Sequence, residues 1–336
     1  MTHTTPLPDF VHDAINLASP RLGSQVTFAT DDFFADKSRM LKDEPAVFIA
    51  DKYDDCGKWM DGWESRRRRD GGHDFCIIKL GVYGVINGVD IDTSHFTGNY
   101  PPGASIDACA SARPPTDATE WVEIVPPTTL GGDAHHFVAV QNNASFNYLR
   151  LHMLPDGGIA RLRVYGMPQA ENVDADEVIE LSAVKSGGRI VAFNDSHYGD
   201  PWVILTEGRG KDMGDGWETR RRREPGNDWI IVKLGVPGIV ERIEVDTAHY
   251  KGNFPDRCSV EGAYVDGGTD QSIVTQAMFW REILPQHKLQ MDHRHFYEDD
   301  ALINVGKVSH IKLNIFPDGG ISRLRIFGHS AQDETR

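Results

Sequence analysis

A short stretch that combines a carboxylate with a run of guanidinium groups occurs twice in this chain. Its sequence is Asp-Gly-Trp-Glu-[Ser/Thr] followed by four arginines, with the glutamates at Glu64 and Glu218. Guanidinium groups bind carboxylates through paired hydrogen bonds, so one face of each run is predicted to hold an anionic substrate. Alternation along an extended backbone puts every second arginine on the side of the glutamate. The predicted substrate-binding arginines are Arg66, Arg68, Arg220 and Arg222.

An alternative interpretation of these runs is structural. A charged strand edge resists aggregation, and the arginines of the other face can pair with the many acids of the chain. Four adjacent arginines cannot all be buried, because each would need a partner. The return of the whole stretch, with its Trp and its Glu, favours a functional role for Glu64 and Glu218.

A second repeated pattern is Asp-Thr-x-His-aromatic-x-Gly-Asn, which follows a predicted strand in each copy. Its histidines are His95 and His249, and its asparagines are Asn99 and Asn253. Histidine exchanges a proton near neutral pH, and asparagine offers a donor and an acceptor to an amide-like ligand. A plain turn built on the glycine and asparagine is the alternative. We interpret the histidines as catalytic and the asparagines as substrate-binding residues.

Two further repeated features are weaker candidates. His136 and His295 each precede Phe and are predicted to supply a second imidazole to the substrate. The pattern Pro-Asp-Gly-Gly-Ile-x-Arg-Leu-Arg, at 155–163 and 317–325, predicts a turn followed by an edge strand. Alternation places Arg161 and Arg163 on the outward face of that strand.

The elements that position these residues are predicted to be strands. Apolar runs at 77–80 and 230–234, and period-two alternation at 89–91, 149–151, 162–164 and 243–245, are separated by Gly, Pro, Asp and Asn. Many short strands with turns predict an all-β fold with one jelly-roll β-sandwich per repeat. The predicted repeats span 13–168 and 177–330, joined by a polar linker.

Composition narrows the classes of partner. The 336 residues suit two domains, and the net charge of −15 argues against nucleic acid and acidic membrane surfaces as partners. The four cysteines lack a metal-binding or disulfide spacing, so we expect free thiols in the cytoplasm. No signal peptide and no long apolar span is visible. No cofactor motif occurs, so none is predicted, and metal dependence stays open.

Taken together, the repeated motifs resemble the tandem repeats of the allantoicase family over roughly residues 15–330, including the loop Asp31-Asp32-Phe33-Phe34-Ala35. The resemblance implies two jelly-roll repeats similar to galactose-binding domains. It also implies the conversion of allantoate and water to ureidoglycolate and urea, in purine breakdown. Within that reaction we expect Arg66 or Arg68 to hold the carboxylate, His95 to protonate the leaving nitrogen and Glu64 to activate water. We also expect a homo-oligomer.

Two other functions remain open at this point. One is a ureidoglycolate urea-lyase, which would need nearly the same site. The other is a non-catalytic tandem carbohydrate-binding module, since jelly rolls of this type often bind sugars. Arg, His and Glu in the repeated loops favour a small anionic ligand over a sugar.

Overall fold

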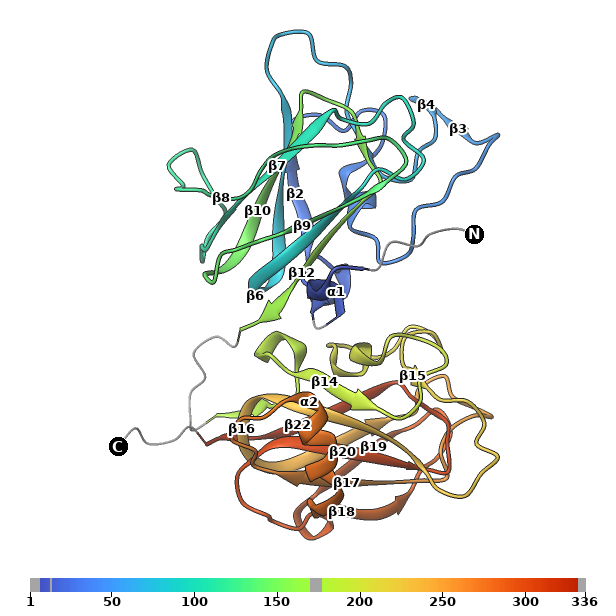
Figure 1. The fold of residues 1–336 in the computed structure, drawn as a ribbon. Helices are drawn as coiled ribbons and strands as arrows, with labels where there is room; N and C mark the ends of the chain where they lie inside the picture. The colour runs from blue at the N-terminus through green and yellow to red at the C-terminus, as the bar shows by residue number, and fades with distance from the viewer. Residues whose placement is uncertain (1–6, 13, 170–176, 332–336) are drawn as a thin grey trace. The chain divides into compact units, whose positions relative to one another are not determined.

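The chain folds into two β-rich units that divide after Gln169 (Figure 1). The computed structural model describes residues 7–12, 14–169 and 177–331. Most of the predicted linker, at 170–176, lies outside the described residues, as does the predicted N-terminal boundary at residue 13.

The first unit is built from strands joined by turns and short helices. Its helices are α1 (Asp9–His12) and the 3-10 helices η1 (Pro20–Leu22) and η2 (Lys37–Leu41). Its strands are β1 (Ile15–Asn16), β2 (Gln25–Ala29), β3 (Tyr53–Asp54), β4 (Gly57–Lys58), β5 (Trp63–Glu64), β6 (Asp74–Asp92), β7 (Gly103–Cys109), β8 (Val122–Thr129), β9 (His135–Ala139), β10 (Ser145–Leu154), β11 (Gly158–Ile159) and β12 (Arg161–Pro168).

The second unit repeats this plan and adds a helix, α2. Its helices are α2 (Asp270–Gln276) and the 3-10 helices η3 (Val184–Ser186), η4 (Pro201–Leu205), η5 (Ala277–Phe279) and η6 (Asp299–Ala301). Its strands are β13 (Val178–Glu180), β14 (Arg189–Phe193), β15 (Trp217–Glu218), β16 (Asp228–Asp246), β17 (Arg257–Ala263), β18 (Arg281–Lys288), β19 (Arg294–Glu298), β20 (Val308–Phe316), β21 (Gly320–Ile321) and β22 (Arg323–Ser330).

One long strand in each unit is the centre of an eight-stranded sheet. The first half of β6 pairs with β2 and β10, and its second half pairs with β9 and β12. A strand has only two hydrogen-bonding edges, so each half of β6 has its own pair of neighbours. In the second unit β16 does the same with β14 and β20, then β19 and β22. The predicted all-β fold of two tandem jelly-roll β-sandwiches is confirmed.

The sequence predicts the strand content well and the strand lengths less well. The runs at 77–80 and 89–91, predicted as separate strands, are parts of the single 19-residue strand β6. Its buried positions alternate from Cys76 to Leu80 and face the core, which is dominated by aliphatic side chains with Trp63. The register with β10 shifts between Phe146 and Tyr148.

The prediction for Arg161 is wrong. β12 is not an edge strand, because it pairs with β6 on one side and with β1 on the other. Arg161 is 1% exposed, and its Nη2 donates to Asp61 Oδ2 at 2.6 Å. Its Nε and Nη1 donate to the carbonyls of Glu44 and Asp61, both at 2.8 Å. Arg161 and Arg163 share one face of β12, as alternation predicts, but carbonyl groups of the segment 39–61 cover that face at Arg161.

Candidate active site

Glu64 is held by a short strand with a buried anchor. In β5, Glu64 pairs with Gly158 of β11 and forms a bridge with Ala35 on its other side. Its neighbour Trp63 is fully buried, and the indole Nε1 donates to the Asp31 carbonyl at 2.8 Å. A Cβ on Gly158 would lie 2.0 Å from the Phe96 ring, so only glycine lets β11 approach here.

The carboxylate of Glu64 receives a hydrogen bond from the second repeated motif. Asn99 Nδ2 donates to Glu64 Oε1 at 2.7 Å, which joins motifs 35 residues apart in the sequence. Burial raises the pKa of Glu64 above its ordinary value, and the bond from Asn99 acts in the opposite direction. A carboxyl group with a raised pKa in a partly buried position is suited to proton transfer.

The second repeat builds the same contact. Asn253 Nδ2 donates to Glu218 Oε1, and β15 pairs Glu218 with Gly320 of β21. Trp217 is fully buried, and its Nε1 donates to the Asp195 carbonyl at 2.9 Å. The structure therefore brings the predicted glutamate and asparagine together in both repeats.

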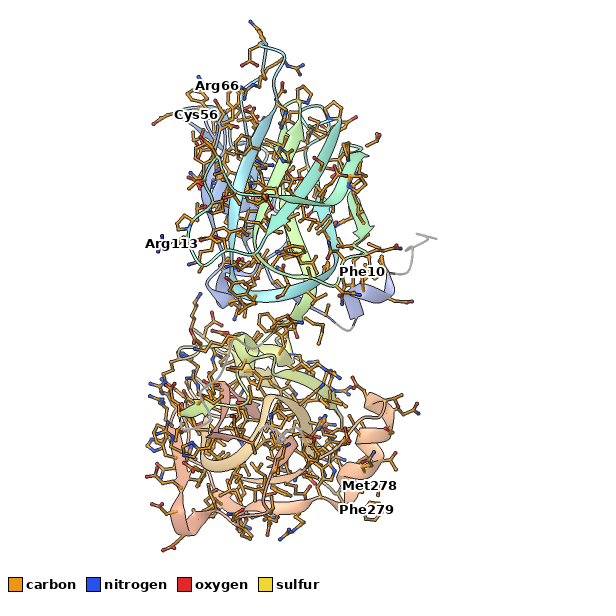
Figure 2. All side chains as sticks on the ribbon, turned by 90° about the vertical axis from the view of Figure 1, so that its left-hand side faces the viewer. Phe10, Cys56, Arg66, Arg113, Met278 and Phe279 are labelled. Atoms are coloured by element: carbon orange, nitrogen blue, oxygen red, sulfur yellow. The ribbon has the colours of Figure 1, made fainter. Side chains whose placement is uncertain are left out.

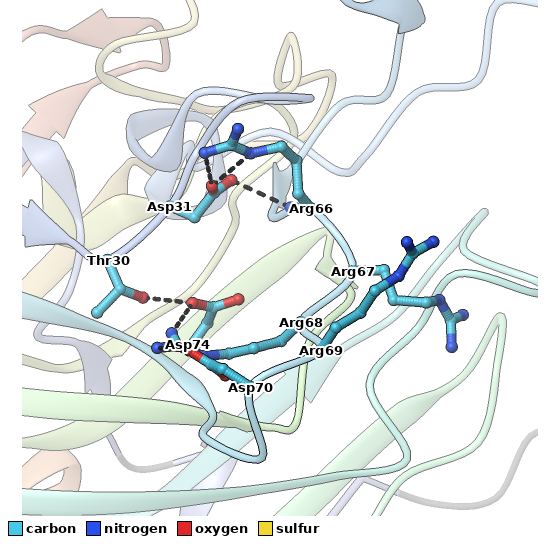
Figure 3. Close-up of a pocket in the computed structure, with 8 residues that line it drawn as sticks. All are labelled: Thr30, Asp31, Arg66, Arg67, Arg68, Arg69, Asp70 and Asp74. Carbon is cyan, nitrogen blue, oxygen red and sulfur yellow. Dashed lines mark hydrogen bonds and ion pairs between the residues drawn. The ribbon is translucent and has the colours of Figure 1, made fainter.

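Alternate arginines of the first run are engaged by acids. Arg66 Nη2 lies 2.6 Å from Asp31 Oδ2, and the Arg66 backbone N–H donates to the same carboxylate at 3.0 Å. Arg68 contacts Asp74 Oδ1 through Nη1 at 2.7 Å and Asp70 Oδ1 through Nε at 2.8 Å. In Figure 3 these two side chains turn toward the acids, whereas Arg67 and Arg69 extend away from them.

The second run repeats the pattern. Arg220 Nη2 lies 2.6 Å from Asp195 Oδ1, and Arg222 Nη1 lies 2.7 Å from Asp228 Oδ1. The four arginines predicted to bind substrate are thus those with carboxylate partners in the protein. Arg67 and Arg221 are exposed and have no ion pair with any residue that the structure describes.

One pocket of the second repeat is lined by residues of both repeated motifs. Its lining includes Glu218, Arg221 and Asn253, together with the turn 317–319. Arg222 also borders it, and both Arg221 and Arg222 also border a second pocket, which Arg220 and Asp195 line. His249 is not part of either lining.

The predicted catalytic histidines sit in a constrained turn. His95 and His249 have φ values of 69° and 70°, a left-handed conformation that is uncommon for a residue with a Cβ. The His95 backbone N–H donates to Asp133 Oδ1 at 2.8 Å, and its Nε2 lies 3.2 Å from the Ala46 carbonyl. His249 Nε2 lies 2.8 Å from the Gly210 carbonyl. Both rings are thus engaged with backbone oxygens.

His136 and His295 bridge backbone groups. His136 Nε2 accepts from the Gly131 N–H at 2.8 Å, and its Nδ1 lies 2.8 Å from the Ile91 carbonyl. His295 makes the same two contacts with Gln290 and Val245. Burial lowers the pKa of His295, which suits a neutral ring with Nε2 as acceptor. Neither ring has a nitrogen left for a substrate.

Sequence reasoning missed the residues that shape the arginine run. The backbone carbonyls of Asp31 and Asp195 accept the two indole N–H groups, and their carboxylates accept from Arg66 and Arg220. Asp156 Oδ2 accepts the Arg68 backbone N–H at 2.8 Å, and Asp318 does the same for Arg222. Their repetition at matching places in both copies was the available signal. Arg67 and Arg221 were passed over because alternation alone does not say which face meets the acids.

The described residues contain neither a metal-binding cluster nor a membrane-spanning helix. Residues 7–12, 14–169 and 177–331 hold no group of three or more His, Cys, Asp or Glu side chains arranged to bind a metal ion. Within the same ranges, no helix has the length and apolar character needed to cross a membrane.

Comparison with known proteins gives a consistent result. The allantoicase repeat model matches twice, at residues 15–169 and 179–331. A probable allantoicase of Ralstonia nicotianae is 59% identical over 324 residues, covering 96% of each chain. A probable allantoicase of Rhizobium meliloti is 56% identical over 334 residues, covering 98% of each. The crystal structure of allantoicase from Saccharomyces cerevisiae aligns with a TM-score of 0.79 and 34% identity, covering 95% of this chain and 94% of that one.

Proposed function

The chain belongs to the allantoicase family, and we propose that a Glu–Asn–Arg group in each repeat carries out the reaction. In the second repeat the group is Glu218, Asn253 and Arg221, which line one pocket. The equivalent residues of the first repeat are Glu64, Asn99 and Arg67, and Arg67 is assigned by this equivalence alone. The enzyme hydrolyses allantoate to ureidoglycolate and urea in purine breakdown. The observation that carries the proposal is the repeated hydrogen bond from an asparagine amide to a partly buried glutamate.

Arg221 and Arg67 are the proposed ligands of the substrate carboxylate. Allantoate carries one carboxylate on the carbon that bears its two ureido groups. Arg221 lines the pocket that also holds Glu218, and no carboxylate of a described residue neutralises it. Arg66, Arg68, Arg220 and Arg222 instead pair with aspartates, which fixes the backbone of the run. This changes the assignment made from the sequence, where those four arginines were expected to bind the anion.

Asn99 and Asn253 are the proposed ureido ligands. Each amide nitrogen is used by the glutamate, which leaves the amide oxygen as an acceptor. A ureido N–H₂ is a donor, so it can bind this oxygen. The substrate would then lie with one ureido group against Asn and its carboxylate against Arg, which puts the central carbon near Glu.

A single carboxyl group can serve both halves of the reaction. Protonated Glu64 donates its proton to the nitrogen of the leaving ureido group, and the C–N bond breaks to release urea. The electron pair on the remaining ureido nitrogen forms a C=N bond to the central carbon. Ionised Glu64 then takes a proton from water as the water oxygen adds to that carbon. Ureidoglycolate forms, and Glu64 regains its proton.

Burial of Glu64 fits the first half of this cycle. Because burial raises its pKa, a larger fraction of the residue carries the proton at a given pH. The role assigned to His95 and His249 from the sequence stays a prediction. Neither ring is part of the proposed group, because each has a backbone oxygen close to Nε2.

We further propose that the enzyme is cytoplasmic and forms a homo-oligomer, with neither nucleic acid nor membrane as a partner. Cys56, Cys76, Cys109 and Cys258 are all free, and a net charge of −15 disfavours phosphate-rich partners. Light scattering of the purified chain measures the oligomeric state, and the mass of a single chain would contradict this part.

The test replaces both glutamates together. A Glu64→Gln, Glu218→Gln double variant keeps the size and hydrogen bonding of the side chains but cannot transfer a proton. We expect urea release from allantoate to fall by about 10²–10⁴-fold. Glu224→Gln, an exposed glutamate just beyond the second arginine run, is the matched control and should keep the rate. Urea release within threefold of the wild-type rate in the double variant would remove the proposal.

A further inference from the structure

The outer face of one sheet in the second repeat is covered by the chain itself. Ile273 and Ala277, from α2 and its C-terminal end, are buried against Ile231 of β16. Trp229 and Trp280 pack at the edges of the same cluster. Beyond the helix, Met278 and Phe279 are 76% and 82% exposed and lie at the surface (Figure 2). Thus α2 covers a patch of the sheet that consists of Ile231 with Trp229 and Trp280 beside it, and we call this patch the aromatic platform.

The first repeat carries the same platform without the helix. Arg150 pairs with Ile77 and Asp107 in the sheet, as Lys312 pairs with Ile231 and Glu261 in the second repeat. The equivalent rings are Phe75 and Trp121 in place of Trp229 and Trp280. The ion pair is also kept, with Arg150 Nη2 2.6 Å from Asp107 Oδ2 and Lys312 Nζ 3.2 Å from Glu261 Oε2.

A shorter connection replaces α2 in the first repeat. The segment between Cys109 and Trp121 is five residues shorter than its counterpart between Ala263 and Trp280. It contains Pro114 and Pro115 and forms no helix. This segment is one wall of a pocket whose other walls are Phe28, Phe75, Trp121 and Arg150. The space that α2 fills in one repeat is therefore an open pocket in the other.

The walls of this aromatic pocket, defined by Phe28, Phe75 and Trp121, bring three aromatic rings close to a guanidinium group. Phe28 is 46% exposed, and its ring centroid lies 5.7 Å from that of Phe75. The Arg150 guanidinium lies 4.7 Å from the Trp121 ring centroid. Flat aromatic and guanidinium surfaces of this kind stack well on planar rings.

Polar groups accompany the rings at the pocket. Arg150 uses Nε and Nη2 for Asp107, and its Nη1 makes no hydrogen bond to a described residue. Asp117, on the connecting segment, lines the pocket as an acceptor without an ion pair among the described residues. The cover in the second repeat is apolar, whereas this pocket offers both a donor and an acceptor.

We propose that the aromatic pocket binds a planar heterocycle whose edge carries both hydrogen-bond donors and acceptors, as a nucleobase does. The ring stacks among Phe28, Phe75 and Trp121. Its acceptor edge meets Arg150, and its donor edge meets Asp117. The site belongs to the first repeat alone, and it shares no residue with the Glu–Asn–Arg group.

Calorimetric titration of the full chain with adenine, and separately with uracil, tests this site. We expect saturable binding at one site per chain for at least one of the two bases. Trp121→Ala should weaken that binding at least about tenfold, because stacking on an aromatic side chain is the main contribution. Phe28→Ser tests the same ring cluster at a half-exposed position, where replacement disturbs the core least. Trp280→Ala, at the equivalent position under α2, is the matched control and should bind as the wild type does.

The same variants distinguish base binding at this pocket from a role in catalysis and from a subunit contact. Urea release from allantoate should be unchanged in Trp121→Ala and Phe28→Ser, so a failure of the active-site proposal would not affect this one. No saturable binding of either base, or equal affinity in the wild type and both variants, would overturn it. A loss of oligomer mass by light scattering in Trp121→Ala, with base binding absent from the wild type, would show a subunit contact instead.

Discussion

In the first repeat Asn99 donates to Glu64, and in the second repeat Asn253 donates to Glu218. The tryptophan before each glutamate is fully buried and donates to an aspartate carbonyl in both copies. The arginine two positions after each glutamate pairs with the same aspartate. Two copies that have diverged elsewhere thus keep one set of contacts, and that set surrounds a carboxylate. This agreement is why we assign the chemistry to both repeats.

The surroundings of this set differ. The segment from Asp31 to Glu64 is ten residues longer than the segment from Asp195 to Glu218. In the first repeat this segment provides the Ala46 carbonyl near His95 and the Phe48 ring, 5.8 Å from the His95 ring. In the second repeat Gly210 provides the carbonyl for His249. A backbone acceptor for the histidine is therefore retained although the segment that supplies it has changed, which indicates an anchoring role.

Removing Arg67 and Arg221, the proposed ligands of the substrate carboxylate, should produce the largest change in substrate binding. We expect Arg67→Ala with Arg221→Ala to raise KM for allantoate about a hundredfold, because a charge-assisted hydrogen-bonded pair is lost. Arg69→Ala with Arg223→Ala is the matched control, since these arginines belong to the same runs and are also exposed. Steady-state kinetics measures both. Equal effects of the two double variants would mean that the whole arginine run, and not Arg67 and Arg221 in particular, binds the substrate carboxylate.

The two repeats differ at one largely buried position that affects the free energy of unfolding, where the second repeat has Glu180 and the first has Asn16. Glu180 of β13 lies 4.0 Å from Arg325, and burial raises its pKa to about 7. At the equivalent position Asn16 accepts backbone N–H groups of Ala18 and Val164. Between the ordinary glutamate pKa and 7 the unfolded chain loses a proton that the folded chain keeps, so stability falls as pH rises through this window.

Glu180→Gln removes that titration. We expect the variant to be about 2 kcal/mol more stable than the wild type at pH 8 and indistinguishable from it at pH 4. Denaturant unfolding at the two pH values measures the difference. A variant that is less stable at pH 8 would mean that the Arg325 contact outweighs the burial of Glu180.

The asparagine contact should tune the pH dependence of the rate. The proposed acid must be protonated, so kcat falls as pH rises above the pKa of Glu64. Asn99→Ala removes a hydrogen bond that lowers this pKa, so the falling limb should move to higher pH, with kcat itself reduced about threefold to tenfold. The profile is read in a Glu218→Gln background, so that only the first repeat contributes. A limb that stays in place would mean that Glu64 is not the titrating acid.

The smallest effect is expected at the histidine. The double variant His95→Asn, His249→Asn should keep urea release within about twofold, because asparagine tolerates a φ near 70° and neither ring has a place in the proposed group. Both histidines are replaced together so that an intact repeat cannot mask a loss in the other. A loss of rate of tenfold or more in this double variant would restore the histidine acid that the sequence predicts.

The sequence predicts the fold and the carboxylate through repetition. The return of Trp, Glu, His and Asn at matching places is enough to locate Glu64 and Asn99, although their contact joins distant motifs. It does not predict which arginines are neutralised. Period-two alternation separates Arg66 and Arg68 from Arg67. Which of these two faces meets Asp31 depends on the tertiary fold, because Asp31 comes from another segment.

The histidines show a second limit of sequence reasoning. His136 has the residue type and repetition of a functional group, yet both of its nitrogens are used by the backbone of Gly131 and Ile91. Backbone partners leave no mark in the sequence, so a structural histidine and a catalytic one look alike there. Arg161 was misplaced for a related reason, since the segment that covers its face of the strand, with Glu44 and Asp61, is distant in the sequence.

We propose that each repeat contains its own proton-handling glutamate. The decisive measurement is urea release in Glu64→Gln and in Glu218→Gln, as separate single variants. We expect each variant to keep the activity of the other repeat, the two residual rates to add up to the wild-type rate, and the double variant to lose both. If either single variant already abolishes urea release, the two repeats do not act as independent sites and the proposal is wrong.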